Sequence, residues 1–250
     1  MNCRLFSVSI ALLTALIPSS ESQAARRLIE VGVDIASGAV GTPLSEEEAA
    51  AAFSVNGSFD FNFLFFHASA DAGYTRAGGD DAVEILADGG IAFAKIHELY
   101  IREGGPNGDM LRVMGGFGGN FGLGALGELT LSAGVISMDW TRPGSEEQSL
   151  LGLYAGTKVF LKIWKFENEL RVAYYAAPQF NPSTSDVAFT DAPLIEGWNQ
   201  GVIASERLRF NAFKISIFEF GPELRARFAN LPDGTEWMAT VGFGGRIGVL

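Results

Sequence analysis

Apolar and polar residues alternate with a period of two along almost the whole chain, and this pattern limits the possible folds more than any other feature. Ile29, Val31, Val33 and Ile35 share one face of such a segment, with Glu30, Gly32 and Asp34 on the other. Helical spacing is confined to the short acidic run at 45–48 and the alanines that follow it. We therefore expect an all-β protein.

The stretch at 53–74, FSVNGSFDFNFLFFHASADAGY, changes parity along its length. Its apolar series is Phe53, Val55 and Phe59 at first and Leu64, Phe66 and Tyr74 further on. A shift of one residue would turn every side chain to the wrong face unless the chain turns or bulges there. We predict a tight turn near residues 59–62 and two strands.

The same construction recurs down the chain. Further tight turns are predicted at 88–90, 122–125, 163–166 and 211–212, and they alternate with longer polar connections at 38–50, 76–81, 104–109, 141–148, 179–195 and 229–236. This spacing gives about twelve strands, or ten if the short strand near 81–88 is lost. Twelve antiparallel strands can close into a barrel, which removes every unpaired strand edge.

The first 24 residues have the pattern of a cleaved signal peptide. Arg4 precedes an apolar run from Leu5 to Ile17, which is shorter than the roughly 20 residues of a membrane-spanning helix, and small residues precede the expected cleavage after Ala24. Residues 25–250 would then form one domain. The only cysteine of the chain, Cys3, would be removed with the signal peptide, which excludes disulfides and thiolate metal sites in this domain.

The composition is acidic and unusually apolar. The formal net charge is −11, which argues against a nucleic-acid partner because phosphate binding needs clustered cations. Only 19% of residues are charged and mean hydropathy is +0.19. We therefore expect the apolar strand faces to meet lipid, although a soluble barrel or sandwich would turn the same residues inward.

Aromatic residues favour the membrane alternative, because they gather near both ends of the predicted strands, as interfacial girdles do. The set predicted at the membrane interfaces is Phe59, Trp164, Phe166, Phe210 and Phe213 at one end and Tyr74, Trp140, Trp198 and Trp237 at the other. The chain thus resembles bacterial outer-membrane β-barrel proteins in general. The resemblance implies an outer-membrane location with lipid as partner, although the chain ends in Leu250 where many such proteins end in an aromatic residue.

The opposite strand faces carry charges of both signs. The predicted pore-lining residues are His67, Asp71, Glu98, Arg102, Arg112, Lys158, Glu169, Arg171, Arg207, Arg209, Glu219, Glu223, Arg225 and Arg227. Such a set either pairs and plugs the barrel or lines a water-filled passage. We predict a monomeric, passive channel for small hydrophilic solutes, with an anion preference from the arginines at 207, 209, 225 and 227. The alternative is a plugged structural or surface-interaction barrel that acts through loops 38–50 and 179–195.

An enzymatic function is the third hypothesis. FHAS at 66–69 resembles the His-x-Ser arrangement of outer-membrane lipid A deacylases, which implies His67 as base and Ser69 as nucleophile. The alternation points both residues inward, away from lipid. We therefore expect no catalysis, no cofactor and no bound metal. The glycine-rich segment at 113–128 lacks the lysine of a phosphate loop, and we expect it to serve close strand packing.

Overall fold

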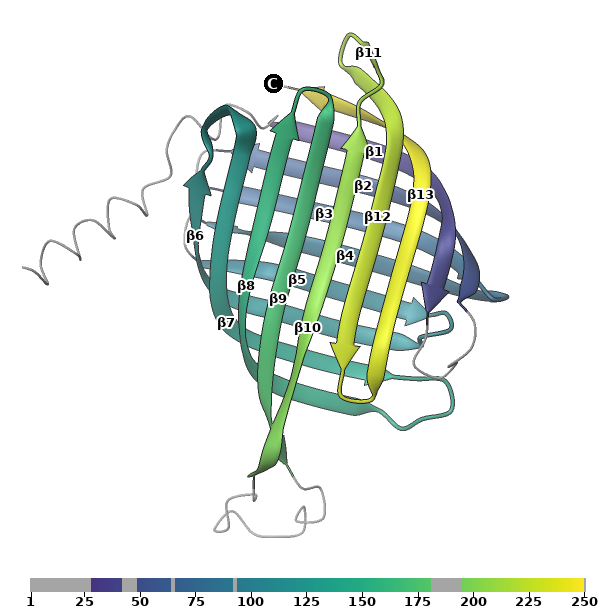
Figure 1. The fold of residues 1–250 in the computed structure, drawn as a ribbon, viewed down its shortest axis with the longest axis vertical. Coiled ribbons are helices and arrows are strands. Elements are labelled where there is room, and N and C mark those ends of the chain that lie inside the picture. The colour runs from purple at the N-terminus through teal and green to yellow at the C-terminus, as the bar shows by residue number, and fades with distance from the viewer. Residues whose placement is uncertain (1–27, 42–48, 64–65, 92–93, 181–194, 250) are drawn as a thin grey trace, which may run out of the picture.

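The chain folds into a closed, antiparallel β-barrel of twelve strands in the computed structural model (Figure 1). The structure describes residues 28–41, 49–63, 66–91, 94–180 and 195–249. The barrel strands are β1 Ile29–Gly41, β2 Ala50–Phe63, β3 Phe66–Ala77, β4 Asp80–Ile91, β5 Ala94–Gly104, β6 Asp109–Gly122, β7 Gly127–Thr141, β8 Gln148–Ile163, β9 Phe166–Phe180, β10 Ile195–Phe210, β12 Phe218–Leu231 and β13 Gly234–Val249. A 3₁₀ turn, η1 Gly124–Leu126, joins β6 to β7, and the three-residue strand β11 Phe213–Ile215 extends a hairpin with β12.

Each strand pairs with its sequence neighbours, and two further pairings close the ring. β1 pairs with β13 along 29–41, and β10 pairs with β12 between Ile203 and Arg209. The front strands β7–β10, β12 and β13 run steeply across the back strands β1–β5 in Figure 1. Strongly tilted strands of this kind are what a closed barrel requires.

The connections define two ends of the barrel. The terminus end holds the start of β1, the ends of β2, β4 and β13, and the connections 123–126, 164–165 and 211–217. The loop end holds the ends of β1 and β9 and the connections 78–79, 105–108, 142–147 and 232–233. The predicted signal peptide and most of loops 38–50 and 179–195 lie outside the described residues.

Several predicted turns lie elsewhere. The turn predicted at 59–62 is wrong, because Phe59 and Phe63 continue the outward series of β2, which runs to Phe63. The turn predicted at 88–90 is also wrong, because β4 continues to Ile91 and Asp88 lies within it. The long connection predicted at 76–81 is a two-residue turn, since Gly78 and Gly79 both have positive φ, a conformation typical of tight hairpins. The predicted long connection at 229–236 is likewise a short turn at 232–233.

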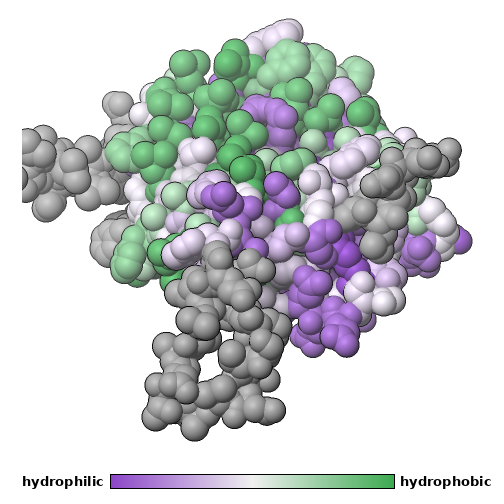
Figure 2. All heavy atoms as spheres, turned by 60° about the horizontal axis from the view of Figure 1, so that its bottom comes forward, coloured by the Kyte–Doolittle hydropathy of each residue, from purple (hydrophilic) through white to green (hydrophobic). Residues whose placement is uncertain are grey.

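The outer wall of the barrel is apolar. Large hydrophobic side chains at alternate positions of the strands are exposed, among them Val33 on β1, Leu153 on β8 and Val241 on β13. Hydrophobic residues cover the wall in Figure 2, while hydrophilic residues gather around the loop end, which is turned toward the viewer. An exposed apolar band of this extent is unusual for a water-soluble surface.

The predicted interface aromatics occupy both ends of this wall, with one exception. Phe59, Tyr74, Trp164, Phe166, Trp198, Phe213 and Trp237 are exposed, and Phe210 is half-buried beside Trp164 and Phe166. Trp140 is only 4% exposed and lies inside the barrel, so its interface assignment is wrong. The outward series of β7 is Leu131, Ala133 and Val135, and Trp140 has the opposite parity.

None of the described helical segments is long and apolar enough to cross a membrane.

Candidate functional site

The lumen of the barrel contains charged side chains that come from the inward faces of strands all around the ring. All fourteen residues predicted to line a pore contact other lumen side chains. Because side chains alternate across a strand, residues two apart on a strand enter the lumen together. The lumen is therefore the candidate site, and its charges decide what it can do.

Arg246 on β13 holds three carboxylates together near the terminus end. Its guanidinium nitrogens lie 2.7 Å from Glu30 Oε1, 2.5 Å from Glu167 Oε2 and 2.8 Å from Glu219 Oε2. These partners come from β1, β9 and β12. Arg246 is nearly fully buried, so each contact is a charge-assisted hydrogen bond shielded from water. The arrangement ties four strands to one side chain.

Two clusters fill the middle of the lumen, and together we call them the septum. In the first, Glu223 Oε1 lies 2.7 Å from Arg207 Nε and 2.6 Å from Arg225 Nε, and Arg225 also contacts Asp34. Asn56 donates a hydrogen bond of 2.8 Å to Asp34. The septum residues are Asp34, Asp71, Asp88, Lys158, Glu169, Arg171, Arg207, Glu223 and Arg225.

Asp88 is the centre of the second cluster. Its carboxylate oxygens lie 2.9 Å from Lys158 Nζ, 2.7 Å from Arg171 Nη1 and 2.8 Å from His67 Nε2. Glu169 also pairs with Arg171, with 2.5 Å between Glu169 Oε1 and Arg171 Nη2. Asp88 is absent from the predicted lumen residues because Asp-Gly-Gly is a typical turn sequence.

The septum contacts cross the lumen instead of running along the wall. Arg171 on β9 reaches Asp88 on β4, although four strands lie between β4 and β9 in one direction around the ring and six in the other. Arg207 on β10 reaches Asp71 on β3 at 3.4 Å in the same way. Side chains from opposite walls therefore meet in the middle of the lumen.

The four arginines predicted to form an anion track are all paired with acids. Arg209 lies 2.5 Å from Glu223, and Arg227 lies 2.5 Å from Glu84, in addition to the contacts of Arg207 and Arg225 above. A column of one sign needs cations whose charge is not cancelled by close acids. Anion preference stays a prediction, and the pairing gives it little support.

His67 and Ser69 face the lumen, where both contact Asp88. Ser69 Oγ donates a hydrogen bond of 2.9 Å to Asp88 Oδ1, and His67 Nδ1 lies 2.8 Å from Asn62 Oδ1. A serine nucleophile would need its proton directed at the histidine base. Ser69 is instead directed at the carboxylate, so the geometry is that of a structural hydrogen-bond network.

The second histidine occupies a β-bulge. The register of β5 against its neighbours shifts at His97, which turns the ring inward against Tyr154, with ring centroids 6.1 Å apart. Gly118 on β6 makes room for it, since a Cβ there would lie 2.8 Å from the ring. Gly116 is equally crowded, with a Cβ only 2.3 Å from the Ala133 carbonyl oxygen. The glycine-rich segment thus serves close packing within β6.

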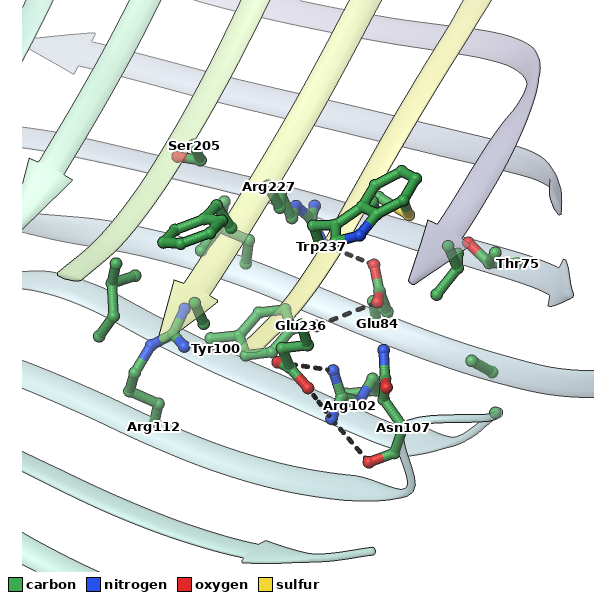
Figure 3. Close-up of a pocket in the computed structure, with 18 of the residues that line it drawn as sticks. Thr75, Glu84, Tyr100, Arg102, Asn107, Arg112, Ser205, Arg227, Glu236 and Trp237 are labelled. Atoms are coloured by element: carbon green, nitrogen blue, oxygen red, sulfur yellow. Dashed lines mark hydrogen bonds and ion pairs between the residues drawn. The ribbon is translucent and has the colours of Figure 1, made fainter. Parts of the chain in front are cut away.

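A chamber lies between the septum and the loop end (Figure 3). It is open to solvent and, with that open space included, measures about 710 Å³; a second open space of the same size lies on the terminus side of the septum. Tyr100 stands in the chamber wall between two guanidinium groups, with its ring centroid 4.9 Å from Arg112 Cζ and 5.6 Å from Arg227 Cζ. Its hydroxyl donates a hydrogen bond of 3.0 Å to Glu84 Oε1. The remaining lining includes Val40, Leu86, Ile203 and Met238.

A latch spans the mouth of the barrel at the loop end. We define it as Arg102, Trp140, Arg142, Asp233 and Glu236. Arg142 Nε lies 2.5 Å from Asp233 Oδ2, which also accepts a hydrogen bond of 3.0 Å from Trp140 Nε1. Arg102 Nη1 lies 3.0 Å from Glu236 Oε1. The latch joins β5 and β7 to the turn between β12 and β13 across the lumen.

Alternation in β13 could have revealed Glu236 and Arg246, which share the inward parity.

The latch predicts an acid-sensitive contribution to stability from Asp233. Burial opposes its ionisation, but the hydrogen bonds from Arg142 and Trp140 outweigh burial and lower the pKa of Asp233 below its ordinary value of 3.8. Its contribution is then complete above the unfolded-state pKa and is lost as the pH falls through the lower folded-state value.

We expect the free energy of unfolding to be higher for the wild type than for Asp233→Asn by a constant amount above about pH 5, with the difference shrinking in stronger acid. Denaturant titrations of both proteins between pH 2.5 and pH 8 measure it. A difference that grows on acidification would contradict the latch.

Comparisons with known proteins match the architecture alone. No family model matches the chain, and no curated protein matches it. Among solved structures, it is similar to the translocator domain of the autotransporter NalP from Neisseria meningitidis, at 11% identity and a TM-score of 0.44 over 94% of this chain and 92% of that one. It is also similar to a bacterial polysaccharide outer membrane secretin, at 6% identity and a TM-score of 0.41 over 90% of this chain and 99% of that one.

Proposed function

We propose that this protein is an outer-membrane β-barrel that is closed at rest, and that its lumen charges brace the wall instead of conducting solutes. The observation that carries the proposal is the set of ion pairs that cross the lumen at the septum, Arg171 to Asp88 and Arg207 to Asp71. Buried charges are tolerated when each is paired and hydrogen-bonded, and breaking such a pair is costly. A barrel braced in this way presents the membrane with an apolar wall and exposes its loop end for interaction.

An outer-membrane location follows from the same reasoning as the fold. Backbone N–H and C=O groups in hydrocarbon must be hydrogen-bonded within the protein, and only helices and closed barrels achieve this. The exposed apolar wall suits the lipid side of such a barrel.

A channel for small hydrophilic solutes is the second candidate. The polar lining and the two spaces on either side of the septum favour it, because a rearrangement of the septum would connect them. In this case the septum acts as a gate.

Single-channel recording in planar bilayers tests the closed state. We expect the wild type to be silent, and a fourfold variant, Asp71→Ala, Asp88→Ala, Arg171→Ala and Arg207→Ala, to give discrete current steps. The variant removes two acids and two cations, so the net charge of the protein is unchanged. Lys158 and Glu169, 3.4 Å apart, still pair with each other.

The double variant Arg76→Ala and Asp81→Ala is the matched control. These two residues form an ion pair of 3.7 Å that is largely exposed at the loop end, and its loss should leave the bilayer silent. Steps from the wild type would overturn the proposal and favour the open channel, with reversal potentials in a salt gradient reporting any anion preference. Silence from the fourfold variant would show that the septum does not close the lumen.

A further inference from the structure

The geometry points to a ligand site in the loop-end chamber, for a small, neutral and mostly apolar molecule that carries one O–H or N–H donor. The chamber lies wholly on the loop side of the septum, so this inference holds whether or not the barrel conducts. Three features of its lining define the class of ligand.

The first feature is an apolar wall. Val40, Ala77, Ala82, Leu86, Ile203 and Met238 line one part of the chamber. Most of these are buried in the barrel, in two clusters of apolar side chains. A ligand that covers this surface gains from apolar contact, so its body should be hydrophobic.

The second feature is charge balance within the lining. Three arginines each face a carboxylate at close range: Arg102 to Glu236 at 3.0 Å, Arg112 to Glu98 at 2.5 Å and Arg227 to Glu84 at 2.5 Å. Figure 3 shows the Arg102–Glu236 and Arg227–Glu84 pairs in the chamber wall, together with Tyr100 and Arg112. A charged ligand would have to break a buried pair in order to be compensated. A neutral ligand leaves all three intact.

The third feature is Asn107, whose amide oxygen has no donor among the described residues. Asn107 is 7% exposed, lines the chamber and carries a buried Oδ1 that accepts no hydrogen bond. Its backbone is fixed, since Arg102 Nη2 donates to the Asn107 carbonyl at 3.0 Å and Arg102 Nε donates to the Gly108 carbonyl at 2.8 Å. Buried acceptors without a donor are rare in proteins. A small rotation of the amide toward the chamber would let a ligand O–H or N–H supply the donor.

The probe 5-fluoroindole fits this class, because it is neutral and apolar and has one N–H. We would measure its binding by fluorine NMR to the full protein in lipid nanodiscs, with empty nanodiscs as the measure of partition into lipid. Detergent is avoided because detergent monomers would compete. Saturable binding to the wild type is expected, beyond that partition.

Asn107→Leu should weaken binding about 3- to 10-fold, as the loss of one neutral hydrogen bond does. Asn211→Leu is the matched control. Asn211 also has a buried Oδ1 without a donor among the described residues, but it lies in the connection after β10 at the opposite end, so binding should be unchanged. Ser205→Phe, which fills the chamber, should abolish binding. Each variant is first checked for a folded barrel by its migration before and after boiling.

A second probe isolates the hydrogen bond itself. The N-methyl derivative of 5-fluoroindole lacks the donor, so it should bind the wild type about as weakly as 5-fluoroindole binds Asn107→Leu, and the substitution should not weaken it further. The inference is overturned if the wild type shows no saturable binding, if Asn107→Leu and Ser205→Phe bind as the wild type does, or if an indole carboxylate binds more tightly than the neutral probe.

Discussion

Replacing Arg246 by leucine should lower the free energy of unfolding by about 3–5 kcal/mol or more, the cost of removing one partner from a buried ion pair. Arg246 is shared by Glu30, Glu167 and Glu219, so the substitution leaves three carboxylates without their common cation. The strands that carry them, β1, β9 and β12, would then repel one another at the terminus end. Urea titration of the barrel refolded in lipid vesicles measures the loss.

Lys214→Leu is the control for this prediction, because Lys214 pairs with the same Glu219 at 3.1 Å. The lysine side chain is 63% exposed, and exposed pairs contribute only about 0–1 kcal/mol. Adding Glu167→Gln to Arg246→Leu should restore part of the stability, since one stranded charge is removed. A loss below about 1 kcal/mol for Arg246→Leu would mean that the lumen is wet enough to solvate the three carboxylates.

Leu153→Arg should destabilise the membrane-inserted barrel by about 2–4 kcal/mol, the cost of a lipid-facing arginine near the bilayer midplane. Leu153 lies well inside β8, is 61% exposed and belongs to the outward series of the strand. An arginine there would have to stretch toward a headgroup layer or draw water into the hydrocarbon. Equilibrium folding into vesicles of defined lipid measures the difference.

The comparison that makes this result specific is Leu123→Arg. Leu123 is also exposed, but it lies in the connection between β6 and β7, beyond the strands and near the headgroups. Its substitution should cost about 0–1 kcal/mol. If both arginines were tolerated within about 0.5 kcal/mol, as exposed positions of soluble proteins are, the apolar wall would not face lipid.

Period-two alternation was enough to predict the architecture, because the strands have one apolar and one polar face over most of their length. The turn between β8 and β9 lies at the predicted position, where Ile163 and Phe166 are joined by two residues. The turn between β2 and β3 was misplaced because Phe63, Leu64, Phe65 and Phe66 form one apolar run that hides the change of parity. Turn residues next to lipid need not be polar, so turn composition is a weaker guide here than in soluble proteins.

The arrangement of the lumen could be predicted only in part. Parity alone selects the inward residues, and it would have placed Trp140 inside had it been applied at the end of β7. Which charges meet depends on barrel diameter and strand tilt, and neither is encoded in local sequence. The contact between Arg171 and Asp88 joins residues far apart in the chain, and the pocket around Asn107 is lined by residues of eight strands and a loop.

The central claim is that the exposed apolar wall faces the hydrocarbon of an outer membrane, and cell fractionation combined with electrophoresis tests it most directly. We predict that the protein will sediment with outer membranes, resist extraction by alkaline carbonate, and migrate faster before boiling than after it. Recovery of the folded protein as a clear, monodisperse solution in detergent-free buffer would contradict the account.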